Sequence, residues 1–547
     1  MRAASALGQA LCRAYRAEGA DFPRLMGGHF ACAVIDPNRE RVLLAVDRMG
    51  IHSLYYAVLP QNGAAFGTRA ANLLPSSGLP EDVSEQAIYD YLYFHMIPAP
   101  GTAFRGLSKV EPACVVVLEK GQRRSTEYWR PDFRKAPPGG PRALERALRP
   151  ALRAAVTRAS ASARKAGAFL SGGLDSSSVT GMLAARLNGS ADAYSIGFGA
   201  EGYDEMGYAR IAAHRFGVRL HEYYVTPANV VDAVPMIADA YDEPFGNSSA
   251  LPAYYCAKLA ADDGIDLMLA GDGGDELFAG NDRYRVQLLF ERFNAIPGFL
   301  RRRALVPLIR GLGGFDRPSV LRRAGAFVRL ADIPLPERLQ SYNFLHRTLP
   351  EEMFDADFLS CVDQEGPTAQ LRRRFQAPEG PASALDRMLF LDWKFTLADN
   401  DLRKVSTMCQ LAGVRVEYPM LDQELIDLSC RIPDGLKLSQ LKLRRFYKGA
   451  MKGFLPDAIL SKKKHGFGLP FGIWMRSHAP LREMTYDHVA QLKGWHVLRP
   501  EFLDRAIDLH RTGHAGYYGE LLWILMMLSM WRNGAGRTAL DSRAAIA

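Results

Sequence analysis

Side chains that can bind phosphate are concentrated in the segment Ser-Gly-Gly-Leu-Asp-Ser, residues 171–176, after the short apolar run 166–170. Two glycines let main-chain N–H groups approach an anion closely, and the amino end of a following helix favours bound phosphate. The Asp175 carboxylate would repel bare phosphate, but it becomes a hard oxygen ligand when Mg²⁺ lies between them. The segment is not a Walker A loop, because the GxxxxGK pattern is absent. It therefore predicts a site for a phosphate chain with Mg²⁺; the alternative is a Ser/Gly turn that caps a helix.

A second motif, Gly-Asp-Gly-Gly-Asp-Glu-Leu, occupies residues 271–277 after the apolar run 266–270. Three acidic residues within five positions are costly to hold together without a cation. Both motifs follow predicted strands, so their loops are expected to meet at the carboxyl edge of one sheet. We therefore predict that Asp175 and Asp275 share Mg²⁺. The alternative is a Gly-Asp turn with its acids at a helix amino terminus.

The elements that carry these motifs alternate between strand and helix, which is typical of a doubly wound parallel sheet with its ligand at the strand carboxyl ends. Beyond about residue 285 the pattern is mostly helical. The predicted strands are 166–170, 193–198, 219–225 and 266–270, and the predicted helices are 143–163, 177–187, 206–216, 230–241 and 252–261.

The chain before this region is β-rich, with short strands predicted at 30–35, 42–46 and 113–118. A Pro-Pro-Gly-Gly-Pro run follows and predicts a linker. The fold class is thus α/β: an α+β part, then a doubly wound domain with a helical carboxyl-terminal extension. The predicted divisions are residues 1–130, the linker 131–142, and residues 143–540.

Composition excludes several classes of protein. The chain has 547 residues, of which 48% are hydrophobic and 23% charged, so it can bury a sizeable core. The longest apolar run, 521–528, is too short to cross a bilayer and is interpreted as part of a core helix. A net charge of +9 can indicate nucleic acid, but the most basic stretch, which begins at 301–303, lacks stacking aromatics and is interpreted as a helical hairpin. We predict an anionic small-molecule substrate, no nucleic acid and no membrane.

The seven cysteines form no CxxC pair, which argues against both a zinc site and a disulfide framework. This indicates a reducing compartment, and we expect a cytoplasmic protein. Residues 1–17 hold three arginines and no acid, which resembles a transit peptide. The apolar spacing from 6 to 15 instead favours an amphipathic helix, which we prefer.

Taken with further motifs, residues 171–176 resemble the pyrophosphate loop of N-type ATP pyrophosphatases, and specifically the asparagine synthetase family. The resemblance implies that ATP and Mg²⁺ activate a carboxylate as an acyl-adenylate with release of pyrophosphate. An amine then attacks to give an amide and AMP; in the synthetases these substrates are aspartate and ammonia. The further motifs are 271–278, Asp242 to Phe245, Lys404-Val405, Tyr418 to Asp422, and Lys462 to Trp474.

The resemblance also implies roles for single residues. The implied pyrophosphate-loop residues are Ser171, Gly172, Gly173, Asp175 and Ser176; the adenine-side positions are Ile196 and Gly271; the Mg²⁺ ligands are Asp175 and Asp275; and the lysine that steadies charge in adenylation is Lys464. For Lys464 the alternative is an ordinary basic surface run.

Two departures from the family bear on the substrate. Asp272 stands where many asparagine synthetases have Glu, and the lost methylene can move a proton-transfer or substrate contact by ~1 Å. Asp401 aligns loosely with an acidic position near the acceptor site, and a structural role is the preferred interpretation of this residue. Beyond Lys404, the sequence Val405-Ser406-Thr407 replaces the frequent Val-Asp-Arg. We take Asp272 and Asp401 as catalytic candidates together with Lys464.

The larger departure concerns the amino-terminal domain, which in the family is a glutaminase with an N-terminal-nucleophile (Ntn) fold and a catalytic cysteine as residue one. Here residue two is Arg and the nearest cysteine is Cys12, so we predict a partial Ntn-type sandwich without glutaminase activity. Either the start lies upstream or the domain is a vestigial scaffold.

Three functions remain open. The first is an asparagine synthetase-like ligase that uses ammonia or another amine, with aspartate as the default acid. The second is a peptide-tailoring cyclase, similar to lasso-peptide or β-lactam synthetases, in which the substrate's own amine attacks. The third is an inactive nucleotide-binding or regulatory protein. The carboxylate is a small molecule or a peptide, and a homodimer is compatible with the resemblance.

Overall fold

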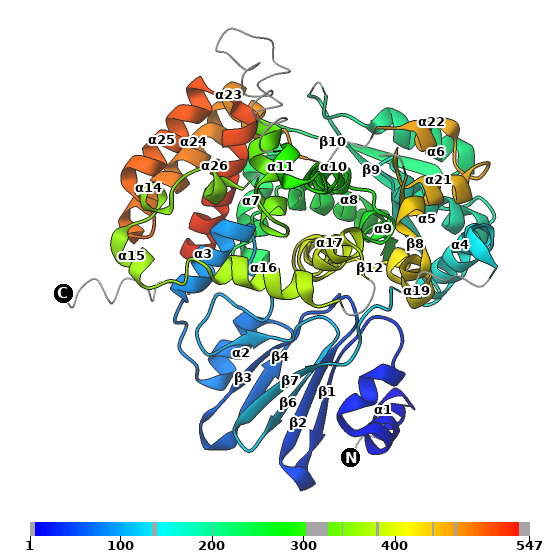
Figure 1. The fold of residues 1–547 in the computed structure, drawn as a ribbon, viewed down its shortest axis with the longest axis horizontal. Helices are drawn as coiled ribbons and strands as arrows, with labels where there is room; N and C mark the ends of the chain where they lie inside the picture. The colour runs from blue at the N-terminus through cyan, green and yellow to red at the C-terminus, as the bar shows by residue number, and fades with distance from the viewer. Residues whose placement is uncertain are drawn as a thin grey trace.

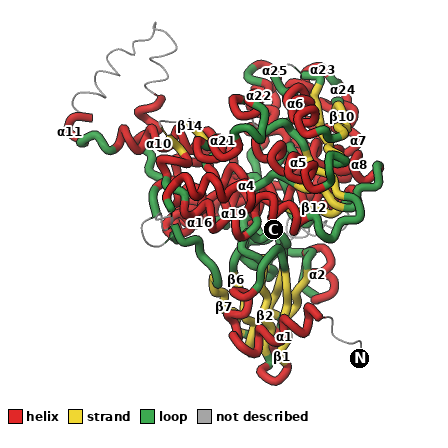
Figure 2. The backbone as a smooth tube through the Cα atoms, turned by 90° about the vertical axis from the view of Figure 1, so that its right-hand side faces the viewer, coloured by secondary structure: helices red, strands yellow, loops and turns green. Residues whose placement is uncertain are grey.

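The computed structural model describes residues 6–133, 139–200, 202–301, 326–341, 343–378, 382–439, 442–463 and 468–534. Figure 1 shows a β-rich amino-terminal part beneath a larger α/β and helical body, and Figure 2 shows the same two parts from the side.

The amino-terminal part is a layered sandwich of two antiparallel sheets, in the orders β1-β2-β6-β7 and β4-β3-β5. Leu44, Tyr56 and Val116 belong to the apolar cluster between the sheets, because alternate residues of a strand face opposite sides. The strands are β1 (Ala31–Asp36), β2 (Arg41–Val46), β3 (Tyr55–Val58), β4 (Ala64–Gly67), β5 (Ser108–Lys109), β6 (Cys114–Glu119) and β7 (Gln122–Glu127).

Helices cover the outer faces of both sheets. Helix α1 (Ala6–Glu18) buries Tyr15 against Leu43 and neighbouring residues of the first sheet, which confirms the predicted amphipathic helix. Helix α2 (Ala70–Ser77) packs against β4, and α3 (Glu85–Phe94) follows it. The helix–sheet–sheet–helix order is the α+β sandwich that the sequence predicts.

The larger body is built on a five-stranded parallel sheet in the order β10-β9-β8-β11-β12. The chain runs outward from β8 to β9 and β10, and then returns to the other side of β8 with β11. The loops after β8 and β11 therefore diverge at a topological switch point, where open α/β sheets bind ligands. The strands are β8 (Ala166–Phe169), β9 (Asp192–Phe198), β10 (Arg219–Val225), β11 (Leu267–Leu269) and β12 (Arg415–Glu417).

Helices pack on both faces of this sheet. α5 contacts β8 and α6 on one side, while α8 contacts β9, β10 and α18 on the other. These elements confirm the predicted doubly wound sheet, although β12 was not predicted. The helices are α4 (Gly140–Ala159), α5 (Leu174–Arg186), α6 (Met206–Phe216), α7 (Pro227–Ala240), α8 (Ala250–Asp262) and α18 (Arg403–Ala412).

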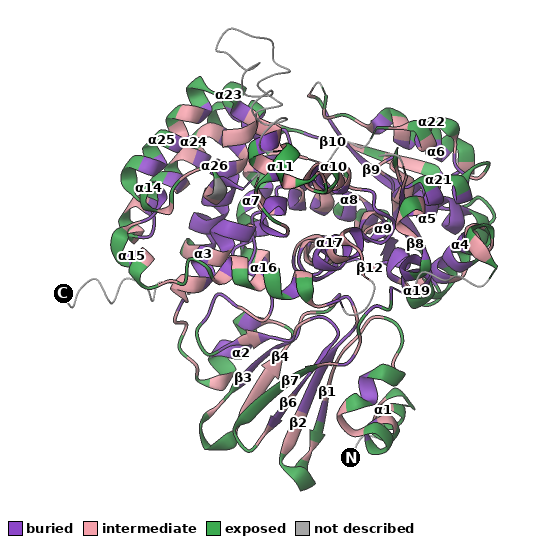
Figure 3. Ribbon diagram, in the orientation of Figure 1, coloured by how far each residue is buried: buried purple, intermediate pink, exposed green. Residues whose placement is uncertain are grey.

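Helices dominate the carboxyl-terminal region. Its centre is α26 (Ala515–Asn533), which contacts α23 (Phe471–Ser477), α24 (Ala479–Gln491) and α25 (Pro500–Thr512). All residues of α26 from Leu521 to Trp531 are buried, as Figure 3 illustrates in purple, so the predicted core helix is confirmed. Among the described residues, no helix is long and apolar enough to cross a membrane. Most of the predicted basic hairpin, at 302–325, lies outside the described residues.

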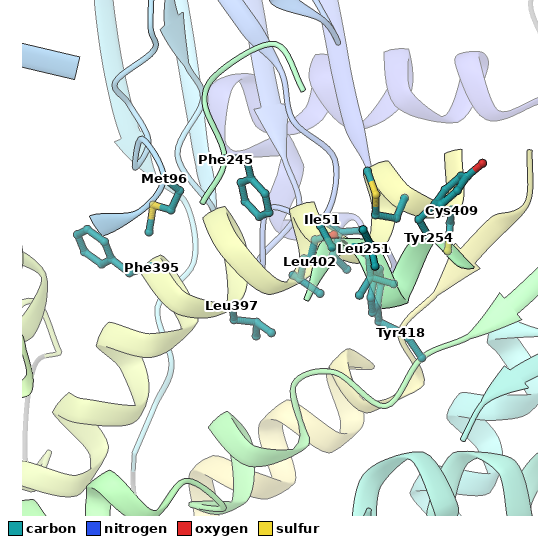
Figure 4. Packing of buried hydrophobic residues seen from close by; sticks show 14 of the residues in the cluster. Ile51, Met96, Phe245, Leu251, Tyr254, Phe395, Leu397, Leu402, Cys409 and Tyr418 are labelled. Carbon is teal, nitrogen blue, oxygen red and sulfur yellow. Dashed lines mark hydrogen bonds between the residues drawn. The ribbon is translucent and has the colours of Figure 1, made fainter. Parts of the chain in front are cut away.

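The two parts share one apolar core. Figure 4 shows Ile51 and Met96 of the amino-terminal part packed with Phe245, Leu251 and Phe395 of the larger body. The interface also contains buried charges. In the predicted linker 131–142, residues 134–138 lie outside the described residues, and helix α4 begins before the linker's predicted end.

Candidate active site

The Ser-Gly-Gly loop joins β8 to α5, and its hydroxyl groups hold its shape. The main-chain N–H of Ser171 donates to Ser176 Oγ at 3.2 Å, and the two Oγ atoms lie 3.0 Å apart. Gly172 has φ of 67°, and a Cβ there would lie 2.5 Å from the Ala209 nitrogen, so a larger residue is excluded. The first N–H groups of α5 have no intrahelical acceptor and are available to an anion.

The second loop joins β11 to α9 (Gly274–Phe278) and touches the first. A Cβ on Gly271 would lie 2.7 Å from the Ser176 nitrogen, so only a glycine lets the two backbones approach this closely. A Cβ on Gly274 would collide with the Asp175 carboxylate. The two motifs, almost 100 residues apart in the chain, thus form one site at the switch point.

Asp175 and Asp275 face a common cation, the guanidinium of Arg444. Arg444 Nη1 donates to Asp175 Oδ2 at 2.5 Å and to Asp275 Oδ1 at 3.1 Å, and Nη2 donates to Asp175 Oδ1. The Arg444 side chain is 3% exposed. Burial opposes its charge, but the Asp175 carboxylate outweighs this and raises the pKa of Arg444 above its usual range. The two carboxylates predicted to share Mg²⁺ therefore lie together, with an arginine between them.

A cavity of about 1100 Å³ opens over both loops. Gly172 shapes the loop without lining this cavity, and Lys464 lies outside the described residues. The structure brings the other sequence-predicted site residues together in the cavity lining: Ser171, Gly173, Asp175, Ser176, Ile196, Gly271, Asp272, Asp275 and Asp401.

One region of this cavity combines acids with a lysine. Asp401 lies on the π-helical segment η7 (Trp393–Leu402), and its Oδ1 accepts a hydrogen bond from Lys404 Nζ at 2.9 Å. Burial raises the pKa of Asp272 to about 6; the Lys404 ammonium opposes this shift, while the Asp401 carboxylate adds to it. A carboxylate with such a pKa exchanges protons near neutral pH, which suits general base catalysis.

The departure after Lys404 has a structural explanation. Ser406 Oγ lies 2.7 Å from the Tyr418 hydroxyl, and that hydroxyl donates to the Leu402 carbonyl at 3.2 Å. The small serine thus joins the start of α18 to the segment after β12. It does not line the cavity, and it replaces a charged residue by a neutral contact.

Several cavity residues were not predicted from the sequence. Lys462 is 7% exposed, donates to the Ser171 and Gly172 carbonyls at 3.5 and 3.4 Å, and pairs with Glu205 at 3.1 Å. Burial lowers its pKa despite that carboxylate. The side chain of the first residue of the basic run 462–464 is therefore largely buried and paired, unlike that of an ordinary surface lysine. Arg444 was missed because its sequence neighbourhood, with Lys442 and Arg445, gives no sign of which cation is buried.

Glu276 was also missed as a site residue, although its motif was recognised. Burial raises the pKa of Glu276 to about 8, with a further contribution from Asp401 and Asp392. Its backbone carbonyl accepts a hydrogen bond from Trp393 Nε1 at 3.0 Å, which fixes this part of α9 against η7. No sequence pattern distinguishes such a buried acid from a solvated one.

The donor atoms suit ATP and Mg²⁺. The described residues contain no group of three or more His, Cys, Asp or Glu side chains placed to hold a metal. Mg²⁺, however, binds proteins through one or two carboxylates together with substrate phosphates. Asp175 and Asp275 match that pattern, provided that Arg444 leaves the space between them.

Comparisons with known proteins agree with this geometry. Residues 147–533 match the asparagine synthase family, and residues 6–129 match the glutamine amidotransferase domain. A provisionally named asparagine synthetase (glutamine-hydrolyzing) of Mycobacterium tuberculosis is 25% identical over 96% of this chain and 79% of its own length. Asparagine synthetase (glutamine-hydrolyzing) 1 of Bacillus subtilis is 23% identical over 95% and 79%, and amidase chyE of Penicillium rubens is 24% identical over 84% and 72%.

The first family match covers most of the chain and includes the motifs 171–176 and 271–277, the sheet that positions them and the helices beyond. At the family level this supports an ATP-dependent amide ligase. The chain belongs to the asparagine synthase family.

Proposed function

We propose that this protein activates a carboxylate with ATP and converts it to an amide. A carboxylate oxygen attacks the α-phosphorus, pyrophosphate leaves, and an acyl-adenylate forms. An amine nitrogen then attacks the acyl carbon, AMP leaves, and the amine loses its proton to a base. Aspartate is the default acid, and ammonia or another amine is the acceptor. The observation that carries this proposal is the meeting of Asp175 and Asp275 in one cavity with Asp272 and Asp401.

The chain's own groups divide this work between two regions of the cavity. The amino terminus of α5 and the Ser171 and Ser176 hydroxyls bind the departing pyrophosphate, since N–H and O–H donors at a helix amino terminus favour an anion. Asp175 and Asp275 would hold Mg²⁺, which supplies positive charge to the triphosphate when bound. Asp272, Asp401 and Lys404 contact the acid or the incoming amine.

Lys464 is proposed to stabilise the negative charge that develops on the phosphoryl oxygens during adenylation. Replacing it by alanine should lower the rate of pyrophosphate release about 10²- to 10³-fold, the usual effect of removing a positioned donor. The circular dichroism spectrum of the variant should match that of wild type, which shows that the fold is unchanged. Lys493→Ala is the control, because Lys493 is an exposed lysine that pairs with Asp504. Equal rates for the Lys464 and Lys493 variants would show that the proposed role is wrong.

Asp272 is proposed to accept the proton of the attacking amine. Its pKa of about 6 reflects burial, the Lys404 ammonium and the Asp401 and Asp175 carboxylates. As pH falls through 6 the carboxylate becomes protonated, so amide formation should decline about tenfold per unit below that value. Asp272→Asn should form the amide about 10²-fold more slowly, and its rate should not show this decline below pH 6. Asp272→Glu should still show the decline. An unchanged pH profile in Asp272→Asn would exclude Asp272 as the base.

Glutamine hydrolysis is not part of this proposal. Cys12 lies inside helix α1 rather than at an amino terminus. Burial raises the pKa of both Cys32 and Cys114 to about 11, which leaves these thiols protonated and poorly nucleophilic near neutral pH. Cys32 and Cys114 therefore lack the activation that a glutaminase nucleophile needs.

A larger acid, as in the peptide-tailoring cyclases, is the second candidate. The specific observation in its favour is the cavity of about 1100 Å³, which is slightly larger than the range of roughly 300–1,000 Å³ for small-molecule sites. In that case the acceptor amine belongs to the substrate and free ammonia is not needed.

The first experiment measures pyrophosphate release from ATP and Mg²⁺ with aspartate, in the presence of ammonium or of glutamine. Release with ammonium but not with glutamine, together with asparagine formation, would support the proposal. If folded protein that binds ATP releases no pyrophosphate with aspartate, the acid is a different one. A panel of amino acids and peptides under the same conditions then tests the second candidate.

A further inference from the structure

The guanidinium of Arg444 lies where the predicted Mg²⁺ site would be. It bonds to both carboxylates, with Nη1 at 2.5 Å from Asp175 and at 3.1 Å from Asp275. We propose that Arg444 is an internal counter-ion that keeps the two metal-binding carboxylates together without nucleotide and moves onto the triphosphate when ATP and Mg²⁺ bind. This inference rests on the proposed ATP and Mg²⁺ chemistry of the same site.

Arg444 and a metal ion compete for these oxygen atoms. Mg²⁺ requires its ligand oxygens at about 2.1 Å and in near-octahedral directions. The arginine occupies both oxygens of Asp175 and the Oδ1 atom of Asp275. A metal that binds between Asp175 and Asp275 would take the place of the guanidinium there, and each cation weakens the binding of the other at this pair of carboxylates.

The arginine is held in a way that permits such a displacement. Its Nε is buried and has no hydrogen-bond partner among the described residues. Burying a donor without an acceptor is unfavourable, so an alternative position with more acceptors can compete. A phosphate group offers these acceptors, because the planar guanidinium fork matches its oxygens in two-point contacts.

The backbone around Arg444 also differs from an ordinary helix start. Arg444 has φ of 56° and ψ of 31°, a left-handed conformation that non-glycine residues rarely adopt. It follows the short pair β13 (Leu438–Ser439) and β14 (Lys442–Leu443) and precedes α21 (Arg445–Met451). Its guanidinium also lies 4.3 Å from the centre of the ring of Tyr447, the third residue of that helix. Such strained positions are concentrated at ligand sites and at segments that switch position.

The neighbouring arginine provides a contrast. Arg445 is exposed, and its Nη1 donates to Ser439 Oγ at 2.8 Å rather than to either site carboxylate. The two arginines carry the same charge and adjoin in sequence, but only Arg444 bonds to Asp175 and Asp275. A metal-binding effect of Arg444 that Arg445 lacks is therefore due to this contact and not to local positive charge.

The test is a titration of Mn²⁺, as a probe for Mg²⁺, monitored by its electron paramagnetic resonance signal, with and without ATP. In nucleotide-free protein, Arg444→Gln should bind Mn²⁺ about tenfold more tightly than wild type, since two carboxylates lose their internal cation. Arg445→Gln should match wild type. With ATP present, wild type should gain affinity for Mn²⁺ more than Arg444→Gln does, because the displaced arginine then contacts the phosphates.

The controls separate this inference from the function on which it rests. Should Arg444→Gln fail to fold, Arg444→Lys keeps one positive charge without the two-point contact, and its affinity for Mn²⁺ should lie above that of wild type. If wild type binds Mn²⁺ with ATP but neither variant binds Mn²⁺ more tightly than wild type without ATP, the counter-ion role is wrong while the metal site stands. If no form of the protein binds Mn²⁺ even with ATP, the proposed metal chemistry itself fails, and the inference fails with it.

Discussion

Asp175→Asn should reduce pyrophosphate release by about 10³-fold or more. Asparagine keeps the size of the side chain but loses its negative charge, so the Asp175–Asp275 pair can no longer provide two anionic oxygens to Mg²⁺. It also removes the main acceptor of Arg444, which bonds to both Asp175 oxygens. The measurement is a continuous assay of pyrophosphate with saturating ATP, Mg²⁺ and the acid.

Asp266→Asn is a suitable control for this prediction. Asp266 immediately precedes β11, at the end of the strand remote from the site, where its carboxylate accepts hydrogen bonds from the Lys165 N–H at 2.7 Å and from Arg415 at 2.8 Å. The Asp266→Asn substitution also removes one negative charge, but at a position far from the cavity. Wild-type release by the Asp175 variant would overturn the assignment of Asp175 to the metal, and an equal loss in both variants would indicate a general effect on the sheet.

The sequence was sufficient to predict that the loops 171–176 and 271–277 meet, and the reason is physical. Short buried strands flanked by helices have a strong local pattern, and parallel strands must place their carboxyl ends at one edge. Residues 171–176 and 271–277 each follow such a strand. Their meeting in the structure follows from the strand order, in which β8 and β11 are neighbours.

The cations of the site could not be predicted in the same way. Whether an arginine or lysine is buried depends on the acids that tertiary folding brings to it, and these are distant in sequence. Arg444 meets Asp175, which lies 269 positions away, and Lys462 meets Glu205. The sequence-based interpretation selected Lys464 from its basic run by resemblance, and that residue lies outside the described residues.

Short or irregular elements were also missed for local reasons. Strands β5 and β12 have two and three residues, too few for a periodic pattern to emerge. The π-helical segment η7 differs from an α-helix in its hydrogen bonding rather than in composition, so sequence does not mark it. Yet η7 carries Asp401, and its end leads directly into Arg403 and Lys404.

Those two residues connect the site to the amino-terminal sandwich. Lys404 pairs with Asp401 in the cavity, whereas Arg403 Nη1 donates to Glu243 Oε2 at 2.5 Å and Nη2 donates to the Tyr55 hydroxyl at 3.3 Å. Glu243 is fully buried and also accepts from Lys109 of β5 at 2.9 Å. The two cations lower the pKa of Glu243 even though burial favours its neutral form. The sandwich is thus joined to the catalytic body by a buried, charged contact.

Glu243→Gln should therefore destabilise the protein by about 3–5 kcal/mol, because Lys109 and Arg403 would remain buried without their carboxylate. Urea denaturation followed by tryptophan fluorescence would measure the change in the free energy of unfolding. The double variant Lys109→Met/Glu243→Gln should lose less stability than the sum of its single variants, since each removes a charge that the other needs. Lys258→Gln, which breaks an exposed pair with Asp262, should leave the unfolding midpoint unchanged.

The Glu243→Gln variant also tests whether the amino-terminal sandwich contributes to substrate binding. If the buried contact positions Arg403, its loss should also disturb the adjacent Lys404 and raise the KM for the acid before it affects ATP binding. Limited proteolysis should release the sandwich from Glu243→Gln more quickly than from wild type. A variant with wild-type stability and wild-type KM would show that the contact is incidental. A raised KM together with faster proteolysis would show that the sandwich is a structural part of the ligase. The sandwich and the larger body would then be held together by charges that neither can bury alone.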